Sequence, residues 1–356
     1  MEFRIHELMN GYGKPAYVIA ELSANHNQNF DTASQIIRAA KQCGADAVKL
    51  QTYTPDTITL NSDKPFFRIA AGTIWDGRTL YDLYGEAYTP WEWHPRLKAV
   101  ADEVAIDLLS SPFDFSAVDL LESMQVPAYK IASPEIVDLP LIDRVARTGK
   151  PLIISTGMAT EAEVEEALKT ARDAGSREIV LLKCTSEYPA PPESMNLRTI
   201  PWLRERFGVP VGLSDHTLGI AVPIAAVALG ACVIEKHFTL SRSVSGPDSA
   251  FSLEPAEFKA MVDAVRIAEK ALGKSELCAT PAEEKSRIFR RSLFVVKDMS
   301  AGERFTADNV RSIRPGHGLH TRHYGEVLKS VASRDIERGT PLSWDLIRTS
   351  GNVNAK

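Results

Sequence analysis

The sequence predicts a (β/α)8 TIM barrel, a closed ring of eight parallel strands with helices outside it, followed by a small β-rich domain. Eight short β-rich runs alternate with amphipathic stretches at a spacing of about 32 residues. The runs are almost continuously apolar, as is typical of a parallel sheet buried on both faces. No G-x-G-x-x-G motif follows the first run, so the main sequence signal for an open, dinucleotide-binding sheet is missing.

Each expected strand starts apolar and becomes polar toward its carboxyl end. The eight runs cover residues 16–24, 46–53, 106–113, 128–136, 151–157, 178–185, 210–217 and 232–239. The stretches between them have helical periodicity, as in FDTASQIIRAAKQCG and AEVEEALKTARDAG. Eight such units in succession favour the closed barrel over an open sheet, and the last helical pattern ends near residue 273.

The pattern changes after residue 273. Residues 274–289 are polar and charged, which predicts a linker between a barrel domain at 1–273 and a second domain at 290–356. The second domain has short strand-like runs separated by glycine-containing turns, so we expect a compact β-rich fold.

The composition is that of an ordinary soluble, globular chain. Its 356 residues include 41 Lys and Arg against 46 Asp and Glu, a net charge of −5, and 44% are hydrophobic. This excludes a collagen-like or disordered chain and argues against a nucleic-acid binder. No apolar run is long enough to cross a membrane, and the start lacks a signal-peptide core. The four cysteines are scattered, so we expect reduced thiols and a cytoplasmic location.

Polar side chains stand near the carboxyl end of every expected strand. In a barrel these ends converge on one mouth, where barrel enzymes place their active sites. Lysines and histidines are among these residues, and the requirements of folding do not explain why all eight strands end in this way. We therefore predict a single catalytic mouth. The residues are Glu21, Lys49, Gln51, Ser111, Lys130, Ser133, Glu135, Ser155, Thr185, Ser214, His216 and His237.

Two histidines occupy corresponding positions on the last two strands, His216 in SDHT and His237 in EKHF. Imidazole nitrogen binds Mn, Fe, Co and Zn, so two imidazoles at neighbouring strand ends predict a catalytic divalent ion with open coordination positions. Glu235 shares a face with His237 and could orient it or hold a metal-bound water. The alternative is a pair of core histidines satisfied by hydrogen bonds.

Lys49 and Lys130 lie within otherwise apolar strands, and a buried lysine needs an anion. One interpretation is an internal ion pair with Glu21 or Glu135. The other is a substrate phosphate or carboxylate helped by the nearby serine hydroxyls, and a phosphorylated carboxylic acid suits that set best. Lys130 and Ser133 have opposite strand parity, so the strand must bulge or end early between them.

Glu21 ends the first expected strand, ahead of SANHN. It is the best candidate for an acid, a base or a ligand of a metal-bound water, and the alternative is a structural carboxylate paired with a lysine. Cys184 carries no feature of an activated nucleophile, so we expect a small buried side chain.

Residues 66–93 form an insertion that holds eight of the 27 aromatic residues. A long aromatic loop beside a barrel mouth predicts a lid over an amphipathic ligand, and the alternative is a satellite core that anchors the insertion. The aromatic residues are Phe66, Phe67, Trp75, Tyr81, Tyr84, Tyr88, Trp91 and Trp93.

Eight motifs, in this order, resemble the sialic acid synthase family: VIAELSANHNQ, VKLQTY, SSPFD, YKIASPE, ISTGM, GLSDHT, IEKHFT and GPDSAFS. The segment around SIRPGHGL resembles the antifreeze-like (SAF) domain that these enzymes carry. The resemblance implies condensation of phosphoenolpyruvate with an amino-sugar aldehyde to give phosphate and a nine-carbon ulosonic acid. It also implies a homodimer with domain-swapped SAF domains.

The resemblance further implies residue roles. His216 and His237 match the metal ligands, for which Mn²⁺ is the first expectation and Mg²⁺ or Co²⁺ the alternatives. Glu21 matches a glutamate that handles a proton, and Arg314 an arginine that reaches the site of the other subunit. The phosphoenolpyruvate site is matched by Lys49, Ser111, Lys130, Ser133, Ser155 and Ser214. Sugar contacts are matched by Gln51, Glu135, Tyr188 and Asp248.

Within the family, residues 73–94 and the motif LLKCTSEYPAP resemble the branch that makes pseudaminic acid from 2,4-diacetamido-2,4,6-trideoxy-L-altrose. Ser186 stands where neuraminic acid synthases have an asparagine facing the sugar, so N-acetylmannosamine is not the expected acceptor. Neuraminate and legionaminate synthesis are the alternatives within the family. Alternatives of other classes are a carbohydrate- or ice-binding module and a metal-dependent aldolase acting on pyruvate.

Overall fold

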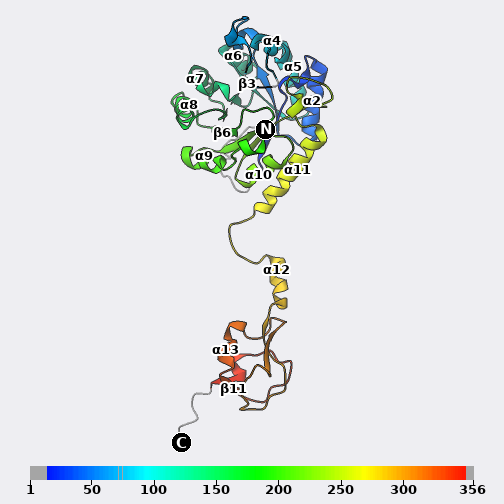
Figure 1. Ribbon diagram of the computed structural model, residues 1–356, viewed down its shortest axis with the longest axis vertical. Helices are drawn as coiled ribbons and strands as arrows, with labels where there is room; N and C mark the ends of the chain where they lie inside the picture. The colour runs from blue at the N-terminus through cyan, green and yellow to red at the C-terminus, as the bar shows by residue number, and fades with distance from the viewer. Residues whose placement is uncertain (1–13, 71, 74, 350–356) are drawn as a thin grey trace. The chain divides into compact units, whose positions relative to one another are not determined.

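The computed structural model describes residues 14–70, 72–73 and 75–349. The chain divides after Gly273 into two compact units, which are described separately (Figure 1). None of the described helices is both long and apolar enough to span a membrane.

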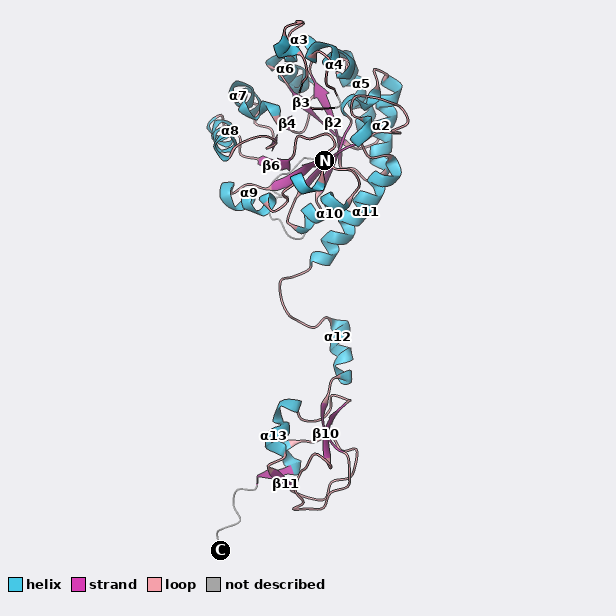
Figure 2. Cartoon of the chain, viewed as in Figure 1, coloured by secondary structure: helices cyan, strands magenta, loops and turns pink. Residues whose placement is uncertain are grey.

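The first unit is a closed barrel of eight parallel strands in sequence order, which confirms the predicted fold class (Figure 2). Each strand pairs with the next, and the ring closes where the eighth strand pairs with the first. The strands are β1 (Tyr17–Glu21), β2 (Ala47–Thr52), β3 (Asp107–Pro112), β4 (Tyr129–Ile131), β5 (Leu152–Ser155), β6 (Ile179–Cys184), β7 (Val211–Asp215) and β8 (Val233–His237).

Helices surround the strands and cover their outer faces (Figure 2). They begin where the sequence supplies caps: the side chain of Asn29 accepts a hydrogen bond from the backbone of Thr32, and Thr160 forms a capping box with Glu163. The helices are α2 (Phe30–Gln42), α3 (Pro55–Ile58), α4 (Leu80–Ala87), α5 (His94–Glu103), α6 (Phe115–Ser123), α7 (Leu139–Ala146), α8 (Glu161–Asp173), α9 (Thr199–Phe207), α10 (Ala221–Ala228) and α11 (Pro255–Leu272).

Strand parity divides the barrel interior into an apolar layer and a polar layer. The apolar layer consists of Ile19, Ala47, Leu109, Ala128, Ile153, Val180, Leu182, Cys232 and Val233. Two residues further along the strands, the same face carries Glu21, Lys49, Ser111, Lys130, Ser155, Cys184, Ser214 and Glu235, all buried. The alternation that fills the barrel therefore also places the polar side chains at the carboxyl ends of the strands.

Strand β4 is short, and this resolves the parity conflict between Lys130 and Ser133. The strand stops at Ile131, and a 3-10 helix follows at Pro134–Val137. Ser133 is thereby turned toward the mouth, where its hydroxyl accepts a hydrogen bond from the backbone N–H of Gly157 at 3.1 Å. The early strand end that the sequence predicts is confirmed.

The aromatic insertion is partly a satellite core, as one of the two sequence interpretations expects. The indole of Trp91 donates to the carbonyl of Tyr53 at 3.1 Å, and Trp93 packs edge-on against Phe30 at 5.7 Å. Phe66, in contrast, is 88% exposed and anchors nothing in this unit. Trp75 lies at the mouth, as described below.

The second unit is the small β-rich fold that the sequence predicts. Two short antiparallel pairs, β9 with β10 and β11 with β12, enclose an apolar core that includes Leu293, Phe305 and Val327. Its elements are α12 (Pro281–Ser286), β9 (Ser292–Val295), β10 (Val310–Ile313), α13 (Tyr324–Val327), β11 (Ser330–Ala332) and β12 (Ile347–Thr349).

We predict that Gly212→Ala destabilises the barrel by about 1–3 kcal/mol, because the interior is already filled. A Cβ at Gly212 would lie 2.4 Å from the carbonyl oxygen of Val233 and 2.7 Å from Cδ2 of Leu182. Gly85→Ala is the matched control, since its Cβ would meet only Pro55 at 3.8 Å within a helix. Urea unfolding measures both variants, and equal stability of Gly212→Ala and wild type would contradict the packing argument.

Candidate active site

The structure brings the predicted residues of the barrel strands together at one mouth. Of the ten residues that follow, none is more than 8% exposed. They are Glu21, Lys49, Ser111, Lys130, Ser133, Ser155, Ser214, His216, Glu235 and His237. A cluster of this many buried polar groups is unusual outside functional sites, because each must be compensated by a partner or a ligand.

Lys49 is held by two carboxylates inside the barrel. Its Nζ lies 2.6 Å from Oε2 of Glu21 and 3.8 Å from Oε2 of Glu235, and it donates to the Ser111 hydroxyl at 3.3 Å. Burial lowers the pKa of Lys49, but the two glutamates outweigh it and hold that pKa above its ordinary value. The internal ion pair that the sequence offered as one interpretation of Lys49 is therefore present.

Lys130 is less completely compensated. Its Nζ donates to the carbonyl of Ile131 at 3.0 Å, and the nearest carboxylate oxygen, on Glu235, is 4.0 Å away. Burial lowers the pKa of Lys130, with Glu235 opposing and Lys49 reinforcing the shift. The predicted pair with Glu135 is not among the described ion pairs, so Lys130 keeps donor capacity for an anionic ligand.

Serine hydroxyls beside the lysines also lack partners. The Oγ atoms of Ser155 and Ser186 are buried without a hydrogen bond. Gly157 makes room for this arrangement, since a Cβ there would lie 2.3 Å from Oγ of Ser186 and 2.6 Å from Oγ of Ser133. The hydroxyls and Lys130 together form a cradle suited to an oxyanion with several acceptor oxygens.

The two histidines face each other, with ring centroids 5.3 Å apart. Nδ1 of His216 lies 2.8 Å from the carbonyl oxygen of Thr185, an arrangement in which Nδ1 donates and Nε2 keeps its lone pair. Nδ1 of His237 is buried without any partner. Burial lowers the pKa of His237 well below its ordinary value, so the ring is neutral.

The donor set fits a catalytic divalent ion. The Nε2 lone pair of His216 is left for a ligand, and the unpartnered Nδ1 of His237 is a buried polar atom that a cation would satisfy. Among the residues that the structure describes, no group of three or more His, Cys, Asp or Glu side chains could hold a metal. The contacts of Glu235 run to Ser214, Lys49 and Lys130, so the structure does not show the predicted orientation of His237 by this glutamate.

A second polar network connects β1, β2 and the loop after β8. The amide of Gln51 donates to Glu21 at 3.0 Å and to the Ser23 hydroxyl at 2.9 Å. Ser23 in turn donates to the carboxylate of Asp248. Two of the predicted sugar-contact residues, Gln51 and Asp248, are thereby joined to the candidate proton carrier Glu21.

Aromatic rings line the same side of the mouth. The ring of Tyr188 lies 4.3 Å from that of His216 and 5.2 Å from that of Phe251. Trp75, from the insertion, packs on Tyr188 at 5.5 Å, and its indole donates to the carbonyl of Pro247 at 3.2 Å. The predicted aromatic lid is thus represented at the mouth by Trp75, while Trp91 and Trp93 anchor the insertion.

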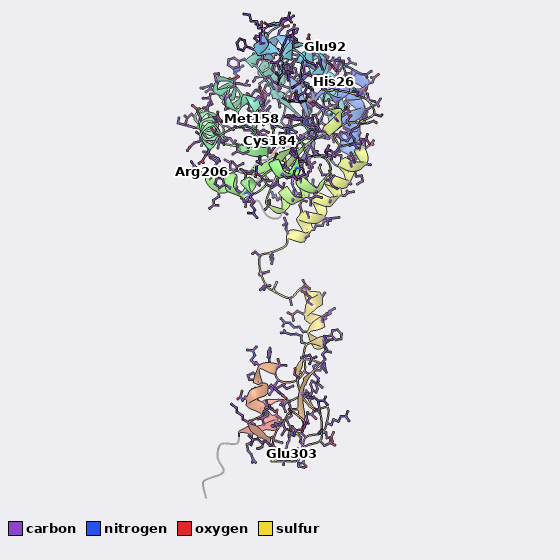
Figure 3. The ribbon with its side chains drawn as sticks, viewed as in Figure 1. His26, Glu92, Met158, Cys184, Arg206 and Glu303 are labelled. Atoms are coloured by element: carbon purple, nitrogen blue, oxygen red, sulfur yellow. The ribbon has the colours of Figure 1, made fainter. Side chains whose placement is uncertain are left out.

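Some residues of the site were missed by sequence reasoning. Cys184, which is labelled in Figure 3, is buried at the end of β6. Its sulfur lies 4.0 Å from Nδ1 of His216. Burial raises the pKa of this thiol, but contacts with His216 and Ser133 outweigh it and lower the value to about 7. Only its inward-facing position as the last residue of β6 could have indicated this from the sequence.

A buried ion pair stands directly behind the histidines. Lys236 and Asp215 face outward under the helices with fully buried side chains, 2.5 Å apart. Lys236 also donates to the carbonyl of Thr217, and Asp215 accepts from the N–H and hydroxyl of Thr217, each at 3.1 Å. The pair therefore fixes the turn that carries His216.

Arg314 is the one predicted site residue that belongs to the second unit, where it lies just after β10.

Glu135 gives the site a pH-dependent stability. Burial raises the pKa of this carboxyl from 4.5 to about 7, and its Oε2 has no hydrogen-bond partner. In the unfolded chain the Glu135 carboxyl ionises at a lower pH than in the native protein. Glu135 therefore lowers the free energy of unfolding as the pH rises from 5 to 8.

We predict that Glu135→Gln stabilises the barrel by about 2 kcal/mol more at pH 8 than at pH 5. Urea unfolding at the two pH values measures the difference. A gain of the same size at both pH values would show that Glu135 titrates normally in the native protein.

Comparison with known proteins identifies the family of this chain. A family model, NeuB family, matches residues 36–277, and a SAF domain model matches residues 290–348. A pseudaminic acid synthase of Helicobacter pylori is 49% identical over 338 residues, or 95% of this chain and 99% of that protein. An N,N'-diacetyllegionaminic acid synthase of Campylobacter jejuni is 38% identical over 91% of this chain and 98% of its own length.

A solved structure agrees with these matches. The crystal structure of an N-acetylneuraminic acid synthetase from Leptospira borgpetersenii, in complex with citrate, has a TM-score of 0.69 at 30% identity. It covers 77% of this chain and 90% of that chain. These findings confirm the resemblance drawn from the motifs: this chain belongs to the NeuB family and ends in a SAF domain.

Proposed function

We propose that this chain condenses phosphoenolpyruvate with 2,4-diacetamido-2,4,6-trideoxy-L-altrose to give pseudaminic acid and phosphate. The observation that carries this proposal is the pair of buried lysines beside unpartnered serine hydroxyls at a barrel mouth. The choice of sugar is supported by 49% identity to the pseudaminic acid synthase of Helicobacter pylori, against 38% to the legionaminic acid enzyme.

The reaction forms one C–C bond and breaks one C–O bond. Carbon 3 of phosphoenolpyruvate attacks the aldehyde carbon of the sugar, which leaves an oxocarbenium at carbon 2. Water adds to carbon 2, and the tetrahedral intermediate expels phosphate together with the former bridging oxygen. The oxygen from water stays on the product, and its protons must be carried away.

The chain contributes fixed positive charge and hydrogen-bond donors to this reaction. Lys130 and the hydroxyl of Ser155 have donors to spare, so they hold the phosphate and carboxylate while charge redistributes. Ser111, Ser133 and Ser214 complete the cradle around them. Glu21, which accepts a hydrogen bond from the Gln51 amide, takes a proton from the attacking water or delivers one to the leaving group.

His216 and His237 would hold a divalent cation, and Mn²⁺ is our first choice, with Mg²⁺ or Co²⁺ as alternatives. When bound, such an ion acts as a Lewis acid on the aldehyde oxygen. The support is the facing pair of imidazoles and the unpartnered Nδ1 of His237.

The sugar is placed between the polar network and the aromatic wall. Gln51, Glu135 and Asp248 offer hydrogen bonds to hydroxyl and acetamido groups, and Tyr188 and Trp75 offer apolar faces. The methyl groups of a trideoxy, diacetamido sugar suit these aromatic faces better than the hydroxyl-rich chain of N-acetylmannosamine.

We further propose a cytoplasmic homodimer in which Arg314 of the partner subunit reaches the mouth. The resemblance of the second unit to SAF domains supports the exchange, and the four free cysteines are compatible with a reducing compartment.

We predict that His216→Ala and His237→Ala each lose bound metal and lower turnover at least 100-fold, because a single imidazole holds the ion weakly. Elemental analysis of the dialysed protein measures the metal, and circular dichroism checks the fold. His320→Ala, an exposed histidine of the second unit, is the control and should keep its metal. Unchanged metal content in both active-site variants would overturn the metal assignment.

We predict that phosphate release with the trideoxy sugar proceeds with a kcat/KM at least 100-fold above that with N-acetylmannosamine. Phosphoenolpyruvate labelled with ¹⁸O at the bridging position should deliver the label to phosphate, and pyruvate should not replace phosphoenolpyruvate. Turnover of N-acetylmannosamine but not of the trideoxy sugar would reject the substrate assignment. Activity with pyruvate would indicate an aldolase instead.

A further inference from the structure

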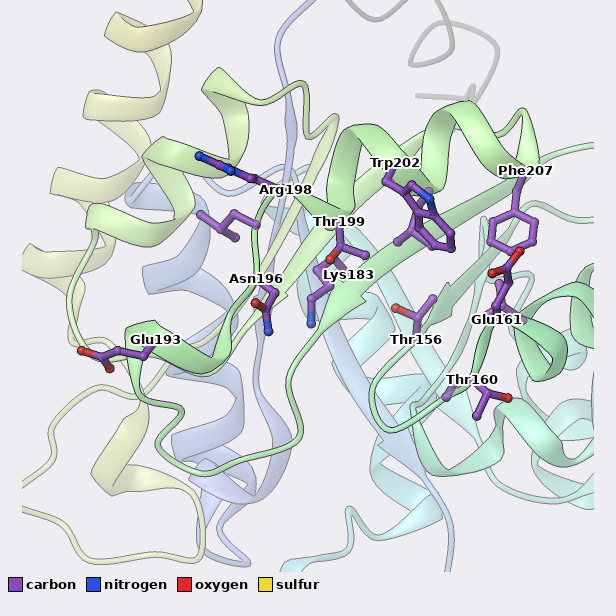
Figure 4. A pocket seen from close by; sticks show the side chains of 14 residues that line it. Thr156, Thr160, Glu161, Lys183, Glu193, Asn196, Arg198, Thr199, Trp202 and Phe207 are labelled. Atoms are coloured by element: carbon purple, nitrogen blue, oxygen red, sulfur yellow. The ribbon is translucent and has the colours of Figure 1, made fainter.

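A cavity of about 560 Å³ lies outside the barrel, between α8 and α9 and behind β6. This volume is within the range of small-molecule pockets. The cavity is separate from the mouth, because Lys183, which lines it, projects to the outer face of β6, whereas Cys184 projects inward. Figure 4 shows the Lys183 amine near the centre of the cavity, with Asn196, Thr199 and Thr156 around it.

Lys183 is a half-buried cation without an anionic partner. Its Nζ donates to the carbonyl of Cys184 at 2.7 Å and to the hydroxyl of Thr185 at 3.1 Å, both neutral oxygens. No carboxylate forms an ion pair with it among the described residues. An ammonium has three donors, so one N–H of Lys183 remains for a ligand. Burial lowers the pKa of Lys183, as expected for a cation that is not compensated.

The rest of the lining suits a ligand with one anionic end and one apolar or flat part. Leu197, Trp202, Leu203 and Phe207 supply the apolar surface, and the Trp202 ring is 44% exposed. The amino-terminal ends of α8 and α9 both border the cavity, at Glu161 and Thr199, which adds positive potential.

Two carboxylates also line the cavity and must be accounted for. Glu161 is neutralised by Arg206, whose Nε lies 2.5 Å from its Oε1. Glu193 is exposed to solvent on the outer rim. Arg198 also lines the cavity, but it is exposed and Figure 4 shows its guanidinium directed away from the Lys183 amine. The charge that faces the interior of the cavity is therefore that of Lys183.

The cavity is linked to the candidate active site through one residue. The Thr185 hydroxyl accepts from Lys183 and donates to the carbonyl of Ser194, at 3.2 Å. The carbonyl of the same Thr185 lies 2.8 Å from Nδ1 of His216. A ligand that draws the Lys183 amine toward itself would loosen its hold on Thr185 and thereby change the setting of His216.

We propose that this cavity is an effector site for an organic oxyanion. The carboxylate or phosphate group binds Lys183, and the ring or apolar part covers Trp202. Binding changes the position of His216 through Thr185. The binding does not depend on the function proposed above, whereas the coupling to His216 rests on it.

Calorimetric titration of the full chain, without substrates, tests the binding. Uridine 5′-monophosphate probes a phosphate source, phenylacetate probes a carboxylate source, and uridine is the uncharged control. We expect at least one anion to bind with a Kd below about 10 mM and at least tenfold more tightly in wild type than in Lys183→Met. Lys169→Met removes an exposed lysine of α8 outside the cavity and should bind as wild type does.

Binding that is absent for both anions, or equally strong in Lys183→Met, overturns the site. Circular dichroism checks whether Lys183→Met is folded, and Lys183→Gln takes its place if it is not. Lys183→Arg, which keeps the positive charge, should bind the anion.

The coupling is tested with the anion that binds. In wild type it should change the metal affinity of the metal-free protein, and the kcat for phosphate release, at least twofold. The Lys183→Met variant should show neither change. Binding of the anion without either change overturns the coupling. If the protein binds the anion but forms no ulosonic acid, the proposed function fails while the binding site stands.

Discussion

Two lysines and two glutamates share the inside of the barrel at a depth from which water is largely excluded, and the rest of the site depends on their balance. Lys49 bridges Glu21 and Glu235, and Lys130 approaches Glu235 from the other side. Removing one partner from such a set leaves an uncompensated buried charge, which costs roughly 3–5 kcal/mol. The free mouth is therefore close to neutral, and an incoming dianion finds cations that are already oriented.

This balance also bears on the two interpretations of the lysines. Lys49 forms the internal ion pair that a buried lysine requires, while Lys130 is left with only a carbonyl oxygen and a distant carboxylate. The unpartnered hydroxyl of Ser155 lies on β5, the strand that pairs with β4 and thus neighbours Lys130. The structural ion pair and the anion site proposed above thus belong to the same layer of the barrel.

Much of the fold and part of the site followed from the sequence because they depend on local periodicity. The strands, their polar carboxyl ends and the early end of β4 all come from an alternation that is visible in single runs. Cys184, Trp75 and the pair of Lys236 with Asp215 acquire their importance from contacts between distant segments, which no local pattern encodes. For Glu235 the local pattern gave the correct face, but its contacts with Lys49 and Lys130 come from other strands and are not visible in a local pattern.

The pair behind the histidines has an evolutionary consequence. A single substitution at position 215 or 236 leaves an unpaired charge buried beneath the helices. A change at one position is therefore tolerated only when the other changes as well, and the singly substituted intermediate is unstable. Each is the sequence neighbour of a histidine, His216 or His237. The dipeptides DH and KH should therefore be inherited as one unit among relatives of this chain, with substitution at one accompanied by substitution at the other.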